Sequence, residues 1–185
     1  MGDTDEEKLW VLQSRKGDPA AFESLIRRHQ RMIHSLTFRM TGSLEDAQDL
    51  AQEAFIRAYR QLDSYQGMSK FSSWLYRIAV NACLNWRQRE RRREQVQANW
   101  AESNEALRSG GDSSNEDVLS QEVQTVLMRL PTQQRAAIVL TVYEGHNHAA
   151  AAQILGCSET TVSWRVFTAR RKLKRWLSAK GVRNE

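Results

Sequence analysis

Apolar residues recur every three or four positions along most of the chain, which is the spacing of one face of an α-helix. Patterns typical of strands are rare, because Val, Ile and Thr seldom cluster. The 185 residues contain only two prolines and nine glycines, so long helices are rarely interrupted. The sequence therefore predicts an all-α protein whose length corresponds to one medium domain or two small ones.

Three long amphipathic helices are expected in the first half of the chain. The first has Pro19 at an early helical position and ends at Gly42. The second follows Ser43, whose hydroxyl can cap it. The apolar stripe of this second helix consists of Ala47, Leu50, Ala51, Ala54, Phe55, Ala58 and Leu62. The third runs from Phe71 into an arginine cluster, and together the three predict a compact bundle.

The second half has shorter helices with clearer end signals. A proline separates a helix over residues 118–130 from a helix that Thr132 is expected to cap. A short helix over residues 148–155 then stops at Gly156, and Ser158 is expected to cap a long basic helix. A short helix, a glycine turn and a longer basic helix are typical of a helix-turn-helix.

Charge is distributed unevenly around a formal net charge of +5. Residues 84–94 carry five arginines against two glutamates, and residues 165–185 carry eight bases against one acid. Residues 95–117, directly after the first of these segments, are acidic and rich in Ser, Asn and Gly. This pattern predicts two helical domains, residues 1–94 and 118–185, joined by a flexible linker over residues 95–117. Two basic segments also favour a polyanionic partner over two merely solvated helix faces.

The last helix carries the candidate DNA contacts. Val162 and Val166 fall on its inward face, and its first turn would enter the major groove. The residues placed to reach base edges are Ser158, Glu159, Thr160, Thr161 and Ser163, with Trp164, Arg165, Phe167 and Thr168 on the remaining outward surface. Three further residues would contact phosphate, namely Arg170, Arg171 and Lys172. An ordinary amphipathic terminal helix is the alternative interpretation.

Two segments resemble a known family. The segment DAQDLAQEAFIRAYRQLDSY, followed by KFSSWLYRIAVNACLNWRQRERR, is similar to conserved region two of bacterial sigma factors. The segment LMRLPTQQRAAIVLTVYEGHNHAAAAQILGCSETTVSWRVFTARRKL is similar to their region four. Since no other domain is apparent, the layout resembles the extracytoplasmic-function (ECF) group, which directs RNA polymerase to promoters.

The resemblance implies the partners and several contacts. The partners are core RNA polymerase, through its β′ clamp helices and β flap, promoter DNA, and an anti-sigma factor. The helix near residues 46–62 would dock on the clamp helices through Asp49, Gln52, Glu53, Arg57 and Arg60. The linker would thread toward the RNA-exit path.

The segment from Ser64 to Asn85 resembles the part that melts the promoter and captures a base of the minus-ten element. The residues expected to contact this DNA are Lys70, Arg77, Asn81 and Asn85, with Arg87, Arg89, Arg91 and Arg92 on phosphate. Phe71, Trp74 and Ile78 share one apolar face, so at least two of them are expected in the core.

The sequence departs from the family pattern in three places. Asn85 replaces a frequent Asp, which removes a charge near the minus-ten DNA. Four alanines at residues 149–152 follow His148 where an aromatic and Glu-Ile-Ala are usual, so looser packing of that helix is expected. The recognition helix has unusual residues at Thr160, Ser163, Trp164 and Thr168. Region four is therefore expected to bind DNA at a minus-thirty-five sequence that differs from the common one.

Several function classes have no support in the sequence. No nucleophilic triad, phosphate loop or paired-carboxylate site is apparent, so neither an enzyme nor a cofactor is expected. His146, His148 and Cys157 could approach one another, but paired ligands at the usual spacing are lacking and no metal is expected. The acidic start, MGDTDEEKLW, is unlike a signal peptide, and no apolar run could span a bilayer. A cytoplasmic protein is expected, held at the inner membrane if its anti-sigma factor lies there.

Two alternatives from other classes remain open. A stand-alone helix-turn-helix regulator would bind a specific duplex without polymerase. A sigma-like protein that titrates an anti-sigma factor would bind DNA weakly, and the alanines at 149–152 keep this alternative open. A nuclease is a more distant third.

Overall fold

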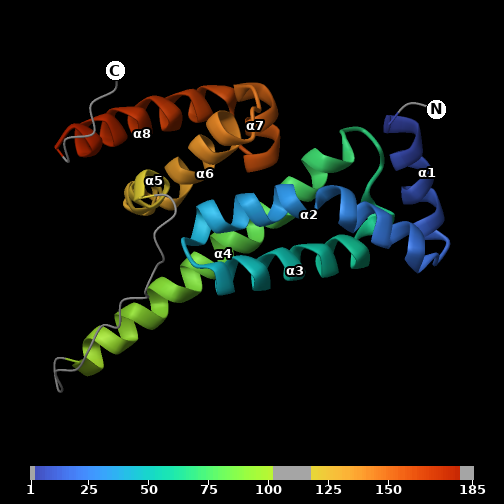
Figure 1. Cartoon of the computed structure of the whole chain (residues 1–185), viewed down its shortest axis with the longest axis horizontal. Coiled ribbons are helices and arrows are strands. Elements are labelled where there is room, and N and C mark those ends of the chain that lie inside the picture. The colour runs from blue at the N-terminus through green and yellow to red at the C-terminus, as the bar shows by residue number, and fades with distance from the viewer. Residues whose placement is uncertain (1–2, 102–117, 180–185) are drawn as a thin grey trace.

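The structure is a computed structural model that describes residues 3–101 and 118–179, and every regular element in these ranges is helical (Figure 1). The all-α prediction is therefore confirmed. In chain order the elements are α1 (Asp3–Arg15), α2 (Pro19–Thr41), α3 (Leu44–Arg60), the 3-10 turn η1 (Leu62–Ser64), α4 (Phe71–Ala101), α5 (Val118–Met128), α6 (Thr132–Ile138), the π-helical turn η2 (Val139–Tyr143), α7 (His148–Leu155) and α8 (Glu159–Ala179).

The ends of α2 and α3 follow from local sequence. The Asp18 carboxylate accepts hydrogen bonds from two amides of the first turn, and Pro19 occupies the first helical position. Gly42 ends α2 in the left-handed conformation with φ 78°, which favours glycine. The Ser43 hydroxyl then accepts from the Asp46 amide at 3.2 Å, as predicted. These caps set the tight corner that brings α3 against α2.

The first half has the expected core. All seven residues of the apolar stripe predicted within residues 47–62 are buried, and α4 covers the bundle. Phe71 and Ile78 are buried and Trp74 is half-buried, so the prediction that at least two of them belong to the core is confirmed. Cys83 is buried too, and burial raises the pKa of its thiol to about 12, which leaves it protonated and unreactive.

The second half forms the predicted helices, but the residue that caps the start of α6 differs from the predicted one. The prediction that Thr132 caps α6 is wrong, because Pro131 occupies the cap position and Thr132 is already helical. The physical reason is that the Pro131 carbonyl already accepts from the amides of Gln134 and Arg135, at 2.9 and 3.0 Å, so the helix starts one residue earlier than expected. Gly156 ends α7 with φ 62°, and the Ser158 hydroxyl accepts from the Thr161 amide at 3.1 Å, as predicted.

Helix α4 is longer than expected. It continues through Ala101, so the first seven residues of the segment predicted as linker are helical and the predicted start at residue 95 needs correction. Residues 95–101 contain neither Gly nor Pro, so nothing in them ends a helix. The rest of the expected linker, including Gly110 and Gly111, lies at residues 102–117, outside the described residues.

The two halves pack against one another, with α5, α6 and α7 along α2 and α4 (Figure 1). One continuous core joins them. The Tyr76 hydroxyl of α4 donates to Glu144 Oε2 at 2.5 Å, and the Tyr76 ring meets the His146 ring edge-on. The buried Arg135 guanidinium of α6 donates to the Met40 carbonyl of α2. This interface fixes how the candidate surfaces of the two halves lie in the structure.

Candidate functional site

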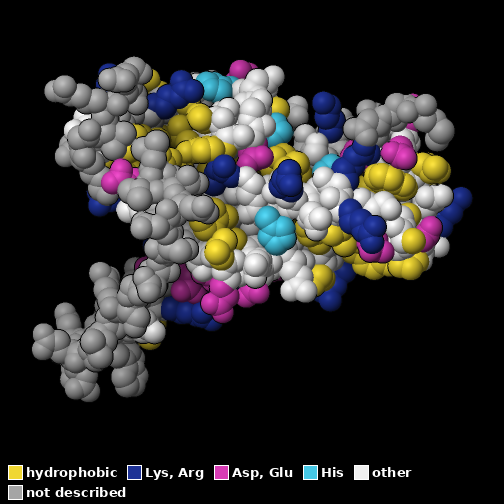
Figure 2. Space-filling view, viewed as in Figure 1, with side chains coloured by type: hydrophobic (Ala, Val, Ile, Leu, Met, Phe, Trp, Pro, Cys, Tyr) yellow, Lys and Arg dark blue, Asp and Glu magenta, His cyan; other side chains and the backbone are white. Residues whose placement is uncertain are grey.

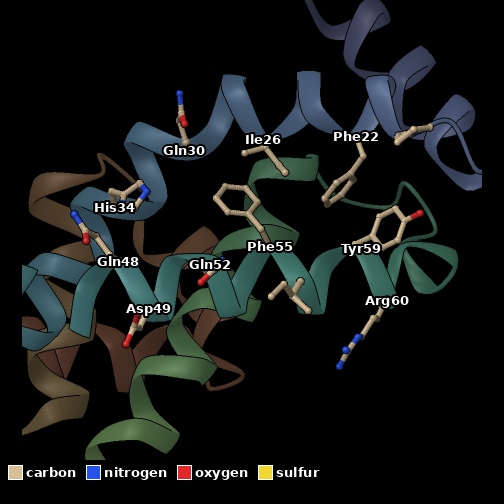
Figure 3. A pocket seen from close by; sticks show the side chains of 12 residues that line it. Phe22, Ile26, Gln30, His34, Gln48, Asp49, Gln52, Phe55, Tyr59 and Arg60 are labelled. Carbon is tan, nitrogen blue, oxygen red and sulfur yellow. The ribbon is translucent and has the colours of Figure 1, made fainter. Parts of the chain in front are cut away.

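A groove with a volume of about 870 Å³ runs between α2 and α3 (Figure 3). Its apolar wall consists of Phe22 and Ile26 from α2, which point toward Phe55 and Tyr59 from α3 (Figure 3). Polar side chains lie along the same groove, among them Gln30, His34, Gln48, Asp49, Gln52 and Arg60. An open apolar groove with a polar rim has the composition of a protein-binding surface.

The five residues predicted to bind polymerase divide into two groups. Asp49, Gln52 and Arg60 are exposed and line the groove. Glu53 and Arg57 instead form an ion pair with each other. Glu53 Oε2 also lies 4.0 Å from Nη2 of Arg89 in α4. Glu53 and Asp49 also line a smaller hollow between α3 and α4, together with Arg89 and Arg93. On the face shown in Figure 2, acidic and basic side chains lie side by side near the start of α3. The structure thus brings three of the five together in one groove.

The sequence interpretation missed the apolar groups of this groove. Ile56 and Tyr59 keep 45% and 46% of their surface exposed. Both lie outside the buried stripe of α3, so apolar residues on its polar face were the signal that could have identified them.

Helix α4 presents the predicted minus-ten residues as one stripe. Arg77, Asn81 and Asn85 are exposed and follow one another at intervals of four residues, which places them on one face. Lys70 is exposed just before the helix begins. Asn81 and Asn85 line a hollow of about 460 Å³ whose opposite wall is the start of α6, residues 131–133. In this arrangement part of the stripe therefore faces the second half of the protein.

The predicted phosphate-binding arginines extend along the outer part of α4, which projects beyond the bundle (Figure 1). Arg91 and Arg92 are exposed. Arg87 donates to Glu94 at 2.9 Å, and Arg89 lies near Glu53. Two of the four arginines are thus partly neutralised by carboxylates, which reduces their share of the attraction to phosphate.

The loop that precedes α4, residues 65–70, is held by a side chain of α1 and by contacts of its own Tyr65. The Arg15 guanidinium of α1 donates to the carbonyls of Leu62 and Tyr65. The Tyr65 hydroxyl donates to the Ser69 carbonyl at 2.6 Å, and its ring packs against Phe71. Burial raises the pKa of Tyr65, so the phenol stays a donor. Sequence reasoning missed Arg15, because no local pattern indicates a contact 47 residues away.

The helix-turn-helix is formed by α7 and α8, and several predicted DNA contacts bond within it. His148 Nδ1 lies 2.8 Å from the Ser163 hydroxyl. Arg165 donates to Cys157 Sγ at 3.5 Å. Lys172 donates to Gln134 of α6 at 3.1 Å and Thr168 is half-buried. The predicted contacts that are exposed on the outer surface are Ser158, Thr160, Trp164, Phe167, Arg170 and Arg171.

The alanine-rich helix α7 is nevertheless well defined. The Asn147 side chain caps it by accepting from the Ala150 amide at 2.8 Å. Ala151, Ala152 and Ile154 are buried in the core shared with α8. Short side chains at 151 and 152 are therefore compatible with a closed helix-turn-helix.

The histidines near α7 do not form a metal site with Cys157. Across residues 3–101 and 118–179, no group of three His, Cys, Asp or Glu side chains lies close enough to hold a metal ion. His148 bonds to Ser163, whereas His146 packs on Tyr76.

None of the helices that the structure describes is long and apolar enough to cross a membrane.

Comparison with known proteins identifies both halves. The family described as Sigma-70 region 2 matches residues 25–93, and the family described as Sigma-70, region 4 matches residues 120–173. The ECF RNA polymerase sigma-E factor of Escherichia coli K12 is 37% identical over 180 residues, covering 92% of this chain and 93% of that protein. The ECF RNA polymerase sigma factor SigM of Mycobacterium tuberculosis H37Rv is 38% identical over 161 residues, covering 87% of this chain and 79% of that protein.

Two solved structures have the same fold. CnrH, in complex with the cytosolic domain of CnrY, is 26% identical with a TM-score of 0.69, covering 94% of this chain and 98% of that chain. The sigma factor RpoE of Bartonella quintana, in complex with the anti-sigma factor NepR, is 24% identical with a TM-score of 0.67. It covers 85% of this chain and 96% of that chain, and supports the fold alone.

Region two followed by region four defines a sigma factor of the sigma-70 type, a transcription initiation factor rather than an enzyme. The chain belongs to the ECF family of these RNA polymerase sigma factors.

Proposed function

We propose that this sigma factor binds core RNA polymerase through region two and directs it to promoters with two separate DNA elements. The two domains are those expected from the sequence, residues 1–94 and 118–185, and helix α4 extends the first of them through Ala101. Core polymerase binds at the groove between α2 and α3, where Asp49, Gln52 and Arg60 meet exposed apolar groups. Glu53 and Arg57 act at the α3–α4 edge of the same surface.

The two DNA contacts lie on α4 and α8. The exposed stripe of Arg77, Asn81 and Asn85, with Lys70, captures the minus-ten strand, and the arginines from 87 to 92 contact phosphate. The exposed face of α8 recognises the minus-thirty-five element. The observation that carries this proposal is that one chain contains both family regions, each with an exposed polar or basic helix face.

An anti-sigma factor controls the protein. The support is that CnrH, which shares the fold over 94% of this chain, was solved with the cytosolic domain of CnrY. The exposed Ile56 and Tyr59 offer apolar area that such a partner can cover in the absence of polymerase. We place the protein in the cytoplasm, where its polymerase acts, with membrane attachment only through the anti-sigma factor.

The test is in vitro transcription with purified core polymerase on a library of genomic promoters. The expected result is initiation at a small set of promoters only when this protein is present. Asp49→Lys is expected to weaken binding to core at least tenfold, because it reverses a charge in the groove. Glu6→Lys, the same charge change on exposed α1, serves as the matched control and retains binding. Specific binding of a duplex without core polymerase would instead identify a stand-alone regulator.

A further inference from the structure

Two aromatic side chains project from the recognition helix into solvent. Trp164 is 61% exposed and Phe167 is 60% exposed. They are three residues apart, so they lie on the same face of α8. This face continues with Thr160 in the preceding turn and with Arg171 in the following one, whose guanidinium carbon is 5.8 Å from the Phe167 ring centroid. An exposed aromatic pair is an unusual feature in the first half of a basic helix.

The polar side chains around this pair are mostly engaged within the domain. The hydroxyl oxygens of Ser158 and Thr161 lie 2.8 Å apart, and the Ser158 hydroxyl caps the helix by accepting from the Thr161 amide. The Ser163 hydroxyl bonds to His148, and Arg165 donates to Cys157. Several hydrogen-bonding side chains in this part of α8 are therefore already engaged, whereas Glu159 and Thr160 are exposed beside the open apolar surface of the two rings.

Thymine is the base that suits such a surface. In the major groove it alone among the four bases carries an apolar substituent, the C5 methyl group, and apolar side chains recognise it by contact. The charges on the same helix favour DNA as the occupant over a protein, because Arg170, Lys174 and Arg175 are exposed beyond the aromatic pair. The first half of α8 is also the part of a recognition helix that faces the bases.

We propose, on the basis of the function proposed above, that Trp164 and Phe167 recognise thymine methyl groups in the upstream promoter element. Trp164 is the specificity-determining residue, because it lies closer to the start of the helix. Phe167 extends the apolar surface along the groove, and Arg171 fixes that ring while its charge faces phosphate. Each buried methyl group is expected to contribute about fourfold in affinity.

The experiment uses the holoenzyme, reconstituted from this protein and core polymerase, on a promoter that it transcribes. Each thymine of the upstream element is replaced singly by deoxyuridine, which removes the methyl group and keeps every hydrogen-bonding group. At one or two positions we expect a loss of about fourfold in affinity, measured by competition. Trp164→Ala is expected to bind the thymine and deoxyuridine promoters equally at that position. Lys174→Ala is the control: it lowers affinity for both promoters by the same factor and leaves their ratio unchanged.

The outcomes separate this proposal from the one on which it rests. If base-pair changes in the upstream element reduce binding but no deoxyuridine does, the methyl proposal is wrong and minus-thirty-five recognition stands. If base-pair changes there have no effect either, the function proposed for region four fails as well. A Trp164→Ala protein that keeps the full deoxyuridine effect also overturns the proposal. The wild-type measurements on modified DNA need no variant, so they stand even if a variant fails to fold.

Discussion

The buried guanidinium of Arg135 makes a sharp test of how region four is held together. It is only 2% exposed. Its nitrogen atoms donate to the carbonyls of Leu127 at 3.1 Å, Met128 at 2.7 Å and Leu130 at 3.2 Å, and also to Met40 across the interface. The first three carbonyls lie at the end of α5, where a helix lacks internal partners. The Arg135 side chain therefore supplies donors to the carbonyls at the end of α5 and also joins the two halves of the protein.

The expected cost of Arg135→Met follows from these bonds. Methionine fills similar space but donates nothing, so four carbonyls lose a charged donor. A buried acceptor without a donor costs about 1–3 kcal/mol, and water is expected to hydrogen-bond to some of the four carbonyls. We therefore expect a loss of about 3–5 kcal/mol, which is less than the summed cost of four fully orphaned acceptors. Burial lowers the pKa of Arg135 to about 10, so the side chain is still charged at pH 7.

Urea unfolding followed by tryptophan fluorescence measures this loss. With an m-value of about 2 kcal/mol per molar urea, the midpoint of region-four unfolding should fall by about 2 M. Arg129→Ala is the matched control, because Arg129 is exposed at the same corner and its removal should change stability by less than about 0.5 kcal/mol. A loss below about 1 kcal/mol for Arg135→Met would refute the reasoning.

Three further predictions use the same unfolding assay. Ser43→Ala removes the cap of α3 and should cost about 1 kcal/mol, so an unchanged midpoint would argue against the capping role. Tyr76→Phe removes the donor to Glu144 and should cost about 1–2 kcal/mol, with no loss expected if the two halves do not pack in solution. Burial lowers the pKa of His146, opposed by Glu144, so the folded protein binds this proton less readily than the unfolded chain. Stability is therefore expected to fall as the pH drops below about 6.5, and His146→Gln should reduce that fall. An identical pH dependence in the wild-type and His146→Gln proteins would contradict the assignment to His146.

The helices could be predicted because their information is local. The apolar stripe of α3, the Ser43 cap and the left-handed turn at Gly156 each depend on residues within a few positions of one another. The family motifs are local as well, and they indicated both sigma regions. The Thr132 cap and the beginning of the linker needed correction, at element ends where competing signals are weakest. Helix α1 was not among the three helices expected in the first half.

The features that the sequence did not predict depend on contacts between segments that are far apart along the chain. Arg135 bonds to a carbonyl 95 residues earlier, and no periodicity shows that a guanidinium will be buried there. Glu53 and Arg57 had the same polar pattern as Asp49, yet they pair with each other and do not line the groove, and Glu53 lies near Arg89 of α4. Such side-chain choices follow from packing, which a single sequence does not reveal. The roles assigned to these residues in binding polymerase and DNA remain predictions.

A footprint of the reconstituted holoenzyme on a promoter that it transcribes tests the central claim most directly. The claim is that one chain, bound to core polymerase, contacts two promoter elements and opens the downstream one. We predict nuclease protection over both elements and permanganate-reactive thymines at the minus-ten element only when this protein and core are both present. Protection by the protein without core, or protection of a single element with no reactive thymines, would contradict the account.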